Sequence, residues 1–437
     1  MRHAVRTATN AAGSRFRDEQ AERAARDAAI LALADDLVVV LGGMRGAAMK
    51  LGQLLAVVDI GISGRRARKE FAERLAPLFS TAPPWTDTAM MRQLEVELGD
   101  ARSRITKLEG PIASASIGQV YRGMLDDGRV VAVKVQYPKI DKMVRADLKN
   151  MRLLMKVLSR YLPAANAHAL GAEIAKQVMA ELDFVSELAN QSYFAEQFEG
   201  HPVIVVPRPV PELCTERVLV TEFLDGDPFT AAKEYDQQRR DRIGEAIYRF
   251  YCGEMYRAGR FCADPHPGNV LLLSDGRVGF VDFGMCIELE PDDHRYERDL
   301  FGAVLSGERE RVHELAVLGG FIGRPDVMDA DDLADFIEAV VGWHVRDGEM
   351  QLTPDIARDA IAAAMLPHGG FYDRFVGQRL QEVHALGRRT EMSTVALLSE
   401  IRATGAWRAI ATEVLGLAPP ATSMGREIER WRAGQSD

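Results

Sequence analysis

Residues 263–284 read ADPHPGNVLLLSDGRVGFVDFG, and this stretch decides the fold. Asp264 and Asn269 stand five residues apart in a loop with two prolines, and a DFG triplet occupies residues 282–284. Two short apolar runs between these motifs flank a Ser-Asp-Gly-Arg turn, which predicts a β-hairpin. Such a hairpin folds Asp282 back toward Asn269. Oxygens of both side chains could then reach one divalent cation, Mg²⁺ or Mn²⁺.

The spacing within this stretch is typical of phosphoryl transfer. In kinase catalytic loops of the form Asp-x-x-x-x-Asn, the aspartate orients the attacking hydroxyl or water and the asparagine binds the metal ion. Asp264 is therefore the candidate catalytic residue, and Asn269 and Asp282 are the candidate metal ligands. His266 has no second His or Cys at ligand spacing, so we interpret it as loop structure rather than as a zinc ligand.

Lys134 lies in a second informative run, VVAVKV at residues 130–135. This run predicts a β-strand, and an ammonium group inside it is costly to bury unless it is paired. In a kinase-like site such a lysine contacts the α- and β-phosphates, and a carboxylate orients it. Lys134 is thus a candidate nucleotide ligand, and the alternative is a lysine at a strand edge whose ammonium reaches water.

Strand patterns surround this lysine. Residues 112–121 and 129–135 are expected to be strands joined by an Asp-Asp-Gly turn. Where a glycine-rich loop would cover the phosphates of a nucleotide, residues 113–116 instead read Ala-Ser-Ala-Ser. L-residues do not visit left-handed conformations as freely as glycine, so this loop should be stiffer than a glycine-rich one. Its candidate nucleotide-binding residues are Ala113, Ser114, Ala115 and Ser116.

The hydrophobic period divides the chain into three parts, so that we predict an α+β, two-lobed protein-kinase-like fold with an N-terminal helical extension. Residues 1–104 form the extension, where apolar residues recur at helical spacing. Residues 105–225 form a small β-rich N-lobe with a helical insertion. Residues 226–437 form a larger C-lobe and C-terminal helices, and a single amphipathic helix is expected over residues 236–260.

Composition excludes several classes of protein. The 437 residues carry 54 Lys+Arg against 64 Asp+Glu, a net charge of −10, which disfavours nucleic acid as a partner. Four cysteines without a CxxC pair fit a reducing compartment. No secretory signal and no apolar run of about 18 residues are found, so we expect a cytoplasmic protein without a transmembrane helix. Membrane contact would then be peripheral, through the basic first 17 residues or the helical extension.

Together these motifs resemble those of the UbiB/ADCK (AarF-like) family of atypical kinases. The similarity runs from about Leu41 to at least Gly284. It includes AMKLGQ with the family's KxGQ signature, the alanine-rich loop PIASASIGQV, the lysine strand VAVKVQYP, the helix ELDFVSELAN, and the metal-site motifs ADPHPGN and VDFG. The chain departs from the family pattern at Ser114, within the alanine run, and we expect it to lack the C-terminal transmembrane helices of some bacterial members.

The resemblance implies a protein-kinase-like fold that binds ATP or ADP with Mg²⁺ and shows ATPase activity more readily than protein phosphorylation. It also implies a role in isoprenoid quinone biosynthesis at the inner face of a membrane, with quinone precursors, isoprenoid lipids and biosynthetic enzymes as partners. Residue by residue, it pairs Glu187 with Lys134 and makes Glu181 and Asp183 the ExD carboxylates.

The same resemblance gives Lys50 and Gln53 a regulatory place. It implies that the extension docks over the active site with both side chains pointing inward, which would occlude the groove that a peptide substrate uses. We hypothesise that Lys50 forms a charged gate with Glu181 and Asp183 near the γ-phosphate. By residue type alone, all four would be ordinary solvated positions on helices.

The hinge between the lobes is expected at residues 221–224, just before an Asp-Gly turn. Backbone groups of Glu222 and Leu224 should contact adenine, and the alternative is an ordinary strand exit. After Gly284 no Ala-Pro-Glu anchor follows, so a platform for peptide substrates is not expected.

Two other functions stay open. One is a small-molecule kinase of the aminoglycoside or choline type, whose catalytic loops also run Asp-x-His-Pro-Gly-Asn but which lacks a KxGQ helix. The other is a nucleotide-gated, non-enzymatic scaffold that binds lipid or protein. The presence of Lys134, Asp264, Asn269 and Asp282 argues against an inactive pocket.

Overall fold

The computed structural model describes residues 86–114, 117–158, 178–323, 328–365 and 382–435, with residues 70, 73–74, 175–176 and 325–326 besides. Its described residues divide into two compact units. Unit 1 consists of the residues up to Gly99, from Glu109 to Tyr121, and from Lys134 to Leu182. Unit 2 consists of the remaining residues.

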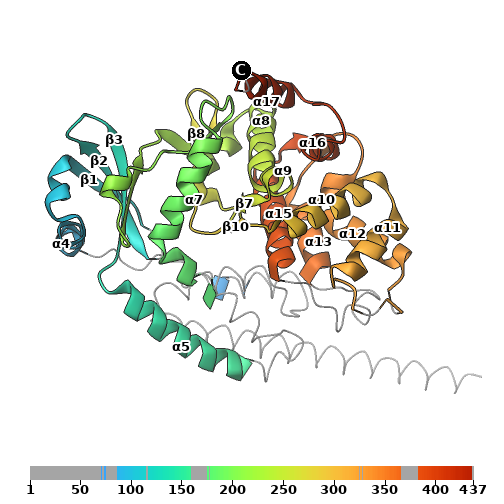
Figure 1. Ribbon diagram of the computed structural model, residues 1–437, viewed down its shortest axis with the longest axis horizontal. Helices are drawn as coiled ribbons and strands as arrows, with labels where there is room; N and C mark the ends of the chain where they lie inside the picture. The colour runs from blue at the N-terminus through green and yellow to red at the C-terminus, as the bar shows by residue number, and fades with distance from the viewer. Residues whose placement is uncertain are drawn as a thin grey trace, which may run out of the picture. The chain divides into compact units, whose positions relative to one another are not determined.

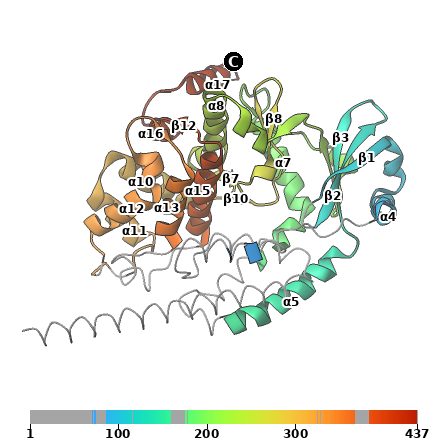
Figure 2. The ribbon, with the colours of Figure 1, turned by 180° about the vertical axis from the view of Figure 1, so that it is seen from behind.

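Figures 1 and 2 show the strands and helices from opposite sides. The strands are β1 (Ile105–Ser114), β2 (Gly118–Leu125), β3 (Val130–Gln136), β4 (Ile204–Val205), β5 (Val218–Glu222), β6 (Gly226–Pro228), β7 (Arg260–Cys262), β8 (Val270–Leu273), β9 (Val278–Phe280), β10 (Cys286–Glu288), β11 (Met350–Gln351) and β12 (Thr404–Gly405). The α-helices are α4 (Asp87–Leu98), α5 (Ile140–Leu158), α7 (Phe184–Gln197), α8 (Gln237–Tyr248), α9 (Glu254–Ala258), α10 (Pro291–Ser306), α11 (Arg309–Leu318), α12 (Ala330–Val345), α13 (Pro354–Met365), α15 (Glu382–Glu400), α16 (Trp407–Val414) and α17 (Ser423–Gly434). Short 3₁₀ segments are η1 (Gly99–Arg104), η2 (Pro211–Leu213), η3 (Phe229–Glu234) and η5 (Pro267–Asn269), and η4 (Arg249–Gly253) is a π-helical segment.

The first sheet has the strand order β1-β2-β3-β5. In β3 the alternate residues Val131, Val133 and Val135 are fully buried, which is the period-2 pattern that predicted this strand. The prediction of one strand over residues 112–121 was wrong, because β1 ends at Ser114 and β2 begins at Gly118. Most side chains of β1 are exposed, so its sequence lacks the alternation that would have marked it.

The second sheet has the order β4-β9-β8-β6 and contains the hairpin expected from the sequence. Strands β8 and β9 pair antiparallel with Val270 opposite Phe280, which confirms the hairpin prediction. Within the apolar run at residues 203–213, Ile204–Val205 pairs parallel to β9, and Pro209 forms an isolated bridge with Thr221. Prolines at positions 207, 209 and 211 lack the N–H donors that a longer ladder needs.

The helices of unit 2 pack around an aromatic core. Helix α15 lies beside α8 and α13, and α13 lies beside α12. The helix expected over residues 236–260 runs from Gln237 to Ala258 as α8, the π-helical turn η4 and α9, and it is capped by Gly259 with a left-handed φ of 69°. This π-helical turn buries all five of its residues, Phe250 and Tyr251 among them.

The fold class is confirmed as mixed α+β, with strands concentrated before residue 290 and helices after it. The domain boundaries after residues 104 and 225 stay predictions. Within the described ranges, no helix combines the length and the apolar character that spanning a bilayer requires.

Candidate active site

The loop that carries Asp264 is held by its own hydrogen bonds. The Asn269 side-chain amide donates to the backbone carbonyl of Asp264 at 3.3 Å. His266 Nδ1 accepts from the backbone N–H of Gly268 at 3.0 Å, which confirms that His266 serves loop structure. The loop therefore ties the candidate catalytic residue to the candidate metal ligand five residues later.

The β8–β9 hairpin returns the chain to the same place. The backbone N–H of Val281 donates to the carbonyl of Asn269 at 3.2 Å, so Asp282, the next residue, begins beside Asn269. The Asp282 carboxylate accepts from the N–H of Gly284 at 3.0 Å through Oδ1. The structure thus brings Asp264, Asn269 and Asp282 together, and their role in one phosphate and metal site stays a prediction.

Helix α7 packs against the DFG triplet and holds it in place. Phe283 is fully buried, and its ring centroid lies 5.5 Å from that of Phe194 and 6.4 Å from that of Phe250. The Asn190 side chain donates to the Phe283 carbonyl at 3.1 Å. Removing an aromatic ring from such a cluster costs about 3–5 kcal/mol, so the position of Asp282 is firmly determined by packing.

Glu187 lies in the first turn of α7, and its carboxylate lies beside Gly284 of the DFG triplet. It is 1% exposed, and it precedes Phe194 by two helical turns. A Cβ added to Gly284 would lie 3.4 Å from Asp282 Oδ1 and 3.7 Å from Glu187 Oε2. Glycine therefore leaves open the space beside two carboxylates. Carboxylate and amide oxygens of this kind suit Mg²⁺, which takes one or two protein carboxylates and completes its shell with phosphate and water.

Arg389 of α15 is a residue of this site that the sequence did not single out. Its Nη2 lies 3.4 Å from Asp264 Oδ1, and both side chains are partly exposed. The two positions are 125 residues apart, and no motif surrounds Arg389, so no pattern in the sequence could have joined them.

Lys134 lies in a strand, as predicted, whereas Ala113 and Ser114, expected in a loop over the phosphates, lie at the end of β1. Lys134 is half-buried in β3, Ala113 is exposed and Ser114 half-buried at the end of β1. At the start of β2, a Cβ on Gly118 would lie 2.3 Å from the Val135 carbonyl, so only glycine allows this approach. The pairing of Lys134 with a carboxylate of α7 stays a prediction.

The ExD carboxylates differ in what they do locally. Glu181 is half-buried just before α7. Asp183 is the N-cap of α7: its Oδ1 accepts from the backbone N–H of Ser186 at 2.9 Å, and its Oδ2 accepts from the Ser186 hydroxyl at 2.7 Å. Asp183 thus has a structural role that the sequence interpretation did not include.

The side chains of the hinge residues Glu222 and Leu224 contact other parts of the protein. Glu222 ends β5, and its Oε2 accepts from the backbone N–H of Arg208 at 3.0 Å. Leu224 packs onto β9, where a Cβ on Gly279 would lie 2.8 Å from Leu224 Cδ1. Adenine contact by their backbone groups stays a prediction. Lys50, Gln53, Ala115 and Ser116 lie outside the described residues.

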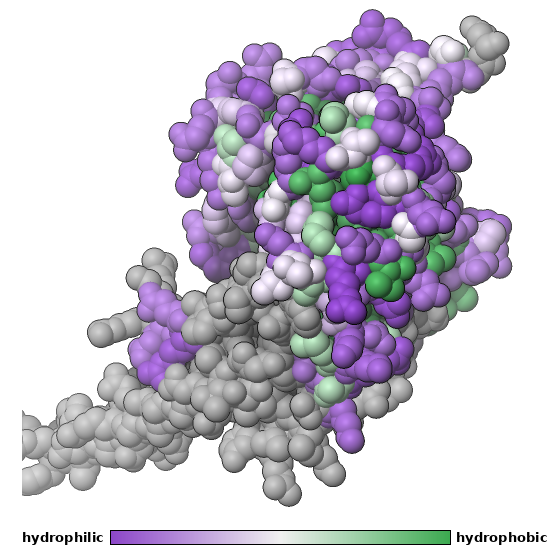
Figure 3. Space-filling model, turned by 90° about the vertical axis from the view of Figure 1, so that its left-hand side faces the viewer, coloured by the Kyte–Doolittle hydropathy of each residue, from purple (hydrophilic) through white to green (hydrophobic). Residues whose placement is uncertain are grey.

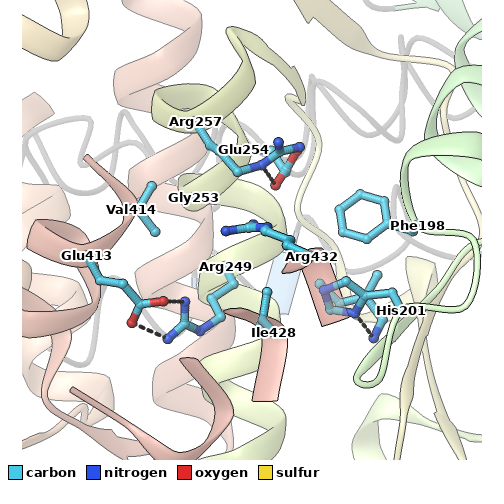
Figure 4. Close-up of a pocket in the computed structure, with 11 residues that line it drawn as sticks. Phe198, His201, Arg249, Gly253, Glu254, Arg257, Glu413, Val414, Ile428 and Arg432 are labelled. Atoms are coloured by element: carbon cyan, nitrogen blue, oxygen red, sulfur yellow. Dashed lines mark hydrogen bonds and ion pairs between the residues drawn. The ribbon is translucent and has the colours of Figure 1, made fainter. Parts of the chain in front are cut away.

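A separate cavity lies between η4, α9 and the C-terminal helices (Figure 4). Its volume is about 20 Å³, which is room for about one water molecule and far less than a nucleotide needs. Arg249 donates to both oxygens of Glu413 at 2.7 and 2.8 Å, and Arg257 pairs with Glu254. None of the predicted site residues lines this cavity, and we interpret it as a paired-charge junction that fixes α17.

The β-rich lobe, the helical lobe and the cluster of Asp264, Asn269 and Asp282 define a kinase-like protein. The model of the ABC1 atypical kinase-like domain matches residues 77–316, and the chain belongs to this family. This confirms the resemblance to the UbiB/ADCK family and the kinase-like fold with a β-sheet N-lobe and a helical C-lobe.

The curated proteins to which the chain is similar carry names of atypical or probable kinases. The chain is 34% identical over 298 residues to "Atypical kinase COQ8B, mitochondrial" of Rattus norvegicus, covering 66% of this chain and 55% of that protein. It is 31% identical to "Probable protein kinase UbiB" of Aeromonas hydrophila, covering 61% of this chain and 51% of that protein. The chain spans about half the length of the curated relatives it matches.

A solved structure is similar over most of the chain. It is the complex of Rv3197 with erythromycin from Mycobacterium tuberculosis, at a TM-score of 0.64 and 28% identity. The match covers 92% of this chain and all of that one.

Proposed function

We propose that this chain binds ATP or ADP with Mg²⁺, with Mn²⁺ as an alternative ion, and that it hydrolyses or transfers the γ-phosphate. Lys134 contacts the phosphates and Glu187 orients it. Asp264 orients the attacking water or hydroxyl, while Asn269 and Asp282 hold the metal ion. When bound, the ion supplies charge neutralisation at the β- and γ-phosphates.

One observation carries the proposal most directly. The hydrogen bond between the Val281 N–H and the Asn269 carbonyl aligns the catalytic loop with the DFG triplet, although the two motifs are separated by a whole hairpin. A structural turn would not need Asp264, Asn269 and Asp282 at this junction. A phosphoryl-transfer site does need these three groups together.

A thermal-shift experiment on the full chain tests the metal role of Asp282. At a nucleotide concentration 100 times its Kd, binding stabilises the folded protein by about 2.7 kcal/mol. We expect Mg²⁺-ATP to raise the Tm by a few degrees in the wild type and by almost nothing in Asp282→Asn. The matched control is Asp275→Asn, the same change in the exposed turn of the same hairpin. An unchanged shift in Asp282→Asn would refute the metal role.

We further propose that the activity supports isoprenoid quinone or lipid metabolism at a membrane surface. The relatives named COQ8B and UbiB support this, and the extension would occlude peptide substrates. ATP turnover should rise when liposomes or phenol-like quinone precursors are added to the purified chain. No stimulation by either would favour the non-enzymatic scaffold.

The first 17 residues, which are basic, are the proposed site of membrane contact. On the described surface, apolar side chains show as patches between hydrophilic ones on the face that Figure 3 draws. The membrane contact proposed for this chain is electrostatic and does not depend on these apolar patches. Sedimentation with anionic vesicles should therefore be lost when the arginines in the first 17 residues are replaced by glutamine.

The complex of Rv3197 with erythromycin favours a second candidate, a protein that binds a macrolide. The same thermal-shift assay distinguishes it. A Tm increase with erythromycin that requires no nucleotide, together with no ATP turnover, would support a ligand-binding scaffold over the enzyme.

A further inference from the structure

Two cysteines face each other across the short ladder between β7 and β10. Cys262 pairs directly with Cys286, and their Sγ atoms lie 3.2 Å apart. The neighbouring pair is hydrogen-bonded, since the Ala263 N–H donates to the Met285 carbonyl at 2.8 Å. Bonded and non-bonded pairs alternate in an antiparallel ladder, so the cysteines occupy a non-hydrogen-bonded position, where Cα atoms are about 4.5 Å apart. That separation lies within the range that a disulfide spans.

The cysteine pair lies close to the candidate site in the sequence, so a bond between the two cysteines would constrain that site. Cys262 is two residues before Asp264, and Cys286 is two residues after the DFG glycine. A bond between them would close a ring that contains Asp264, Asn269 and Asp282. The Cys286 thiol also donates to the Phe283 carbonyl at 3.4 Å, so movement of this sulfur acts on the DFG backbone.

The two thiols differ in exposure, which sets the order of any reaction. Cys262 is 3% exposed, whereas Cys286 is only partly buried. Burial, and then the hydrogen bond with Cys286, raise the pKa of the Cys262 thiol well above its usual value. An oxidant therefore meets the Cys286 sulfur first, and Cys262 is the thiol that reacts second.

We propose that Cys262 and Cys286 form a reversible disulfide in response to a peroxide, and that this bond lowers phosphoryl transfer at the adjacent site. Hydrogen peroxide converts the Cys286 thiol to a sulfenic acid and releases one water. The Cys262 sulfur then attacks, the S–S bond forms, and the hydroxyl leaves as a second water with the Cys262 proton. Two sulfurs are oxidised and the peroxide is reduced to two waters; a dithiol reverses the bond.

The effect on turnover follows from geometry and rests on the proposed function. The sulfurs must move from 3.2 Å to a bond length of about 2.05 Å. This movement takes the Cys286 sulfur out of its hydrogen bond with the Phe283 carbonyl and ties together the strands that lead into the catalytic loop and out of the DFG triplet. Misplacement of reacting groups by about 1 Å costs on the order of 100-fold in rate, so even part of this displacement lowers activity.

Peroxide treatment of the full chain, followed by alkylation of free thiols and mass spectrometry, tests the bond itself. We expect the wild type to lose two hydrogens and two alkylatable thiols, with a cross-linked peptide pair that contains Cys262 and Cys286. Dithiothreitol should restore both thiols. Cys286→Ser should form no cross-link, while the control Cys214→Ser, whose thiol donates to the Val210 carbonyl elsewhere, should still form it. Two alkylatable thiols at positions 262 and 286 after peroxide would overturn the proposal.

ATP turnover of the same samples tests the regulation. Turnover should fall at least fivefold in peroxide-treated wild type and Cys214→Ser, return with dithiothreitol, and stay unchanged in Cys286→Ser. A complete cross-link with undiminished turnover would overturn the regulatory half. If reduced wild type shows no turnover at all, the proposed function fails, and the mass measurement still decides whether the disulfide forms.

Discussion

Arg389 of α15 donates from Nη2 to Oδ1 of Asp264 across 3.4 Å, which links the last long helix to the candidate catalytic residue. The side chains are 26% and 32% exposed, and ion pairs with such exposure contribute about 0–1 kcal/mol to stability. Its importance therefore lies in the orientation of the Asp264 carboxylate rather than in folding.

Replacing Arg389 by Gln should lower kcat for ATP turnover by about 10- to 100-fold while leaving the KM for ATP within about twofold. The carboxylate would lose a fixed donor, but no group that we expect to contact adenine or the phosphates would change. Arg389→Lys should recover part of kcat, since it restores a cation. Steady-state kinetics measure both constants. The control is Arg311→Gln, an exposed arginine paired with Glu314. A loss that appears only in KM, or that parallels a fall in Tm, would contradict a positioning role.

A buried charge network fixes the helix that carries Arg389. Arg388 pairs with Glu297 at 2.6 Å and with Glu391 at 3.2 Å, and His384 contacts Glu297 at 2.7 Å. Burial alone would raise the pKa of Glu297, but Arg388 and His384 outweigh it and lower this pKa. Burial raises the pKa of Glu391 despite the nearby Arg388. Of the two carboxylates, Glu297 is therefore the one whose negative charge contributes more to the network.

Arg388→Met should destabilise the chain by about 3–5 kcal/mol, because it leaves the ionised Glu297 buried without its cation. Urea unfolding measures this difference through the midpoint at constant m-value. Glu391→Gln should cost less than Glu297→Gln by at least about 1 kcal/mol, since the Glu391 pKa is already raised toward neutrality. Equal costs for the two glutamine variants would show that the charge is shared evenly and would contradict this assignment.

The sequence predicted those parts of the site that local spacing determines. Asp264 and Asn269 share one loop, and the β8–β9 hairpin makes the distance to Asp282 a matter of register. By contrast, Arg389 and the network around Arg388 come from packing of distant helices, which no local pattern encodes. The break between β1 and β2 was missed because β1 is exposed and lacks alternation. The capping role of Asp183 could have been found, since Asp immediately before the apolar start of a helical run is an N-cap pattern.

The proposed charged gate of Lys50 with Glu181 and Asp183 makes a separable prediction. Lys50→Ala and Glu181→Ala should each raise ATP turnover by about two- to fivefold, the factor that an ion pair of up to about 1 kcal/mol allows. Asp183→Ala would confound this test, because it also removes the N-cap of α7. Asp183→Asn keeps a good N-cap and removes only the charge. Wild-type turnover and nucleotide affinity in Lys50→Ala and Glu181→Ala would refute the gate.

His201 is a buried titratable group beside the arginine-lined cavity of Figure 4. Its Nδ1 accepts from the backbone N–H groups of Val203 and Ile204 at 3.1 and 2.9 Å, a role that requires an unprotonated nitrogen. Burial, followed by the positive charges of Arg432, Arg249 and Arg257, lowers the pKa of His201 to about 3.

The lowered pKa of His201 predicts acid sensitivity with a definite sign. In the unfolded chain a histidine has a pKa of about 6.5, so below that pH the unfolded state binds a proton that the folded state refuses. The free energy of unfolding should therefore fall between about pH 6.5 and pH 3, by at most about 1.4 kcal/mol per pH unit from this group. His201→Asn, whose amide oxygen can accept the same backbone hydrogen bonds, should flatten that fall. Phe198→Leu, which alters a ring 5.2 Å away without removing a titratable group, should lower stability equally at every pH. Urea unfolding at pH 7, 6, 5 and 4 gives the slopes, and parallel curves for wild type and His201→Asn would refute the assignment.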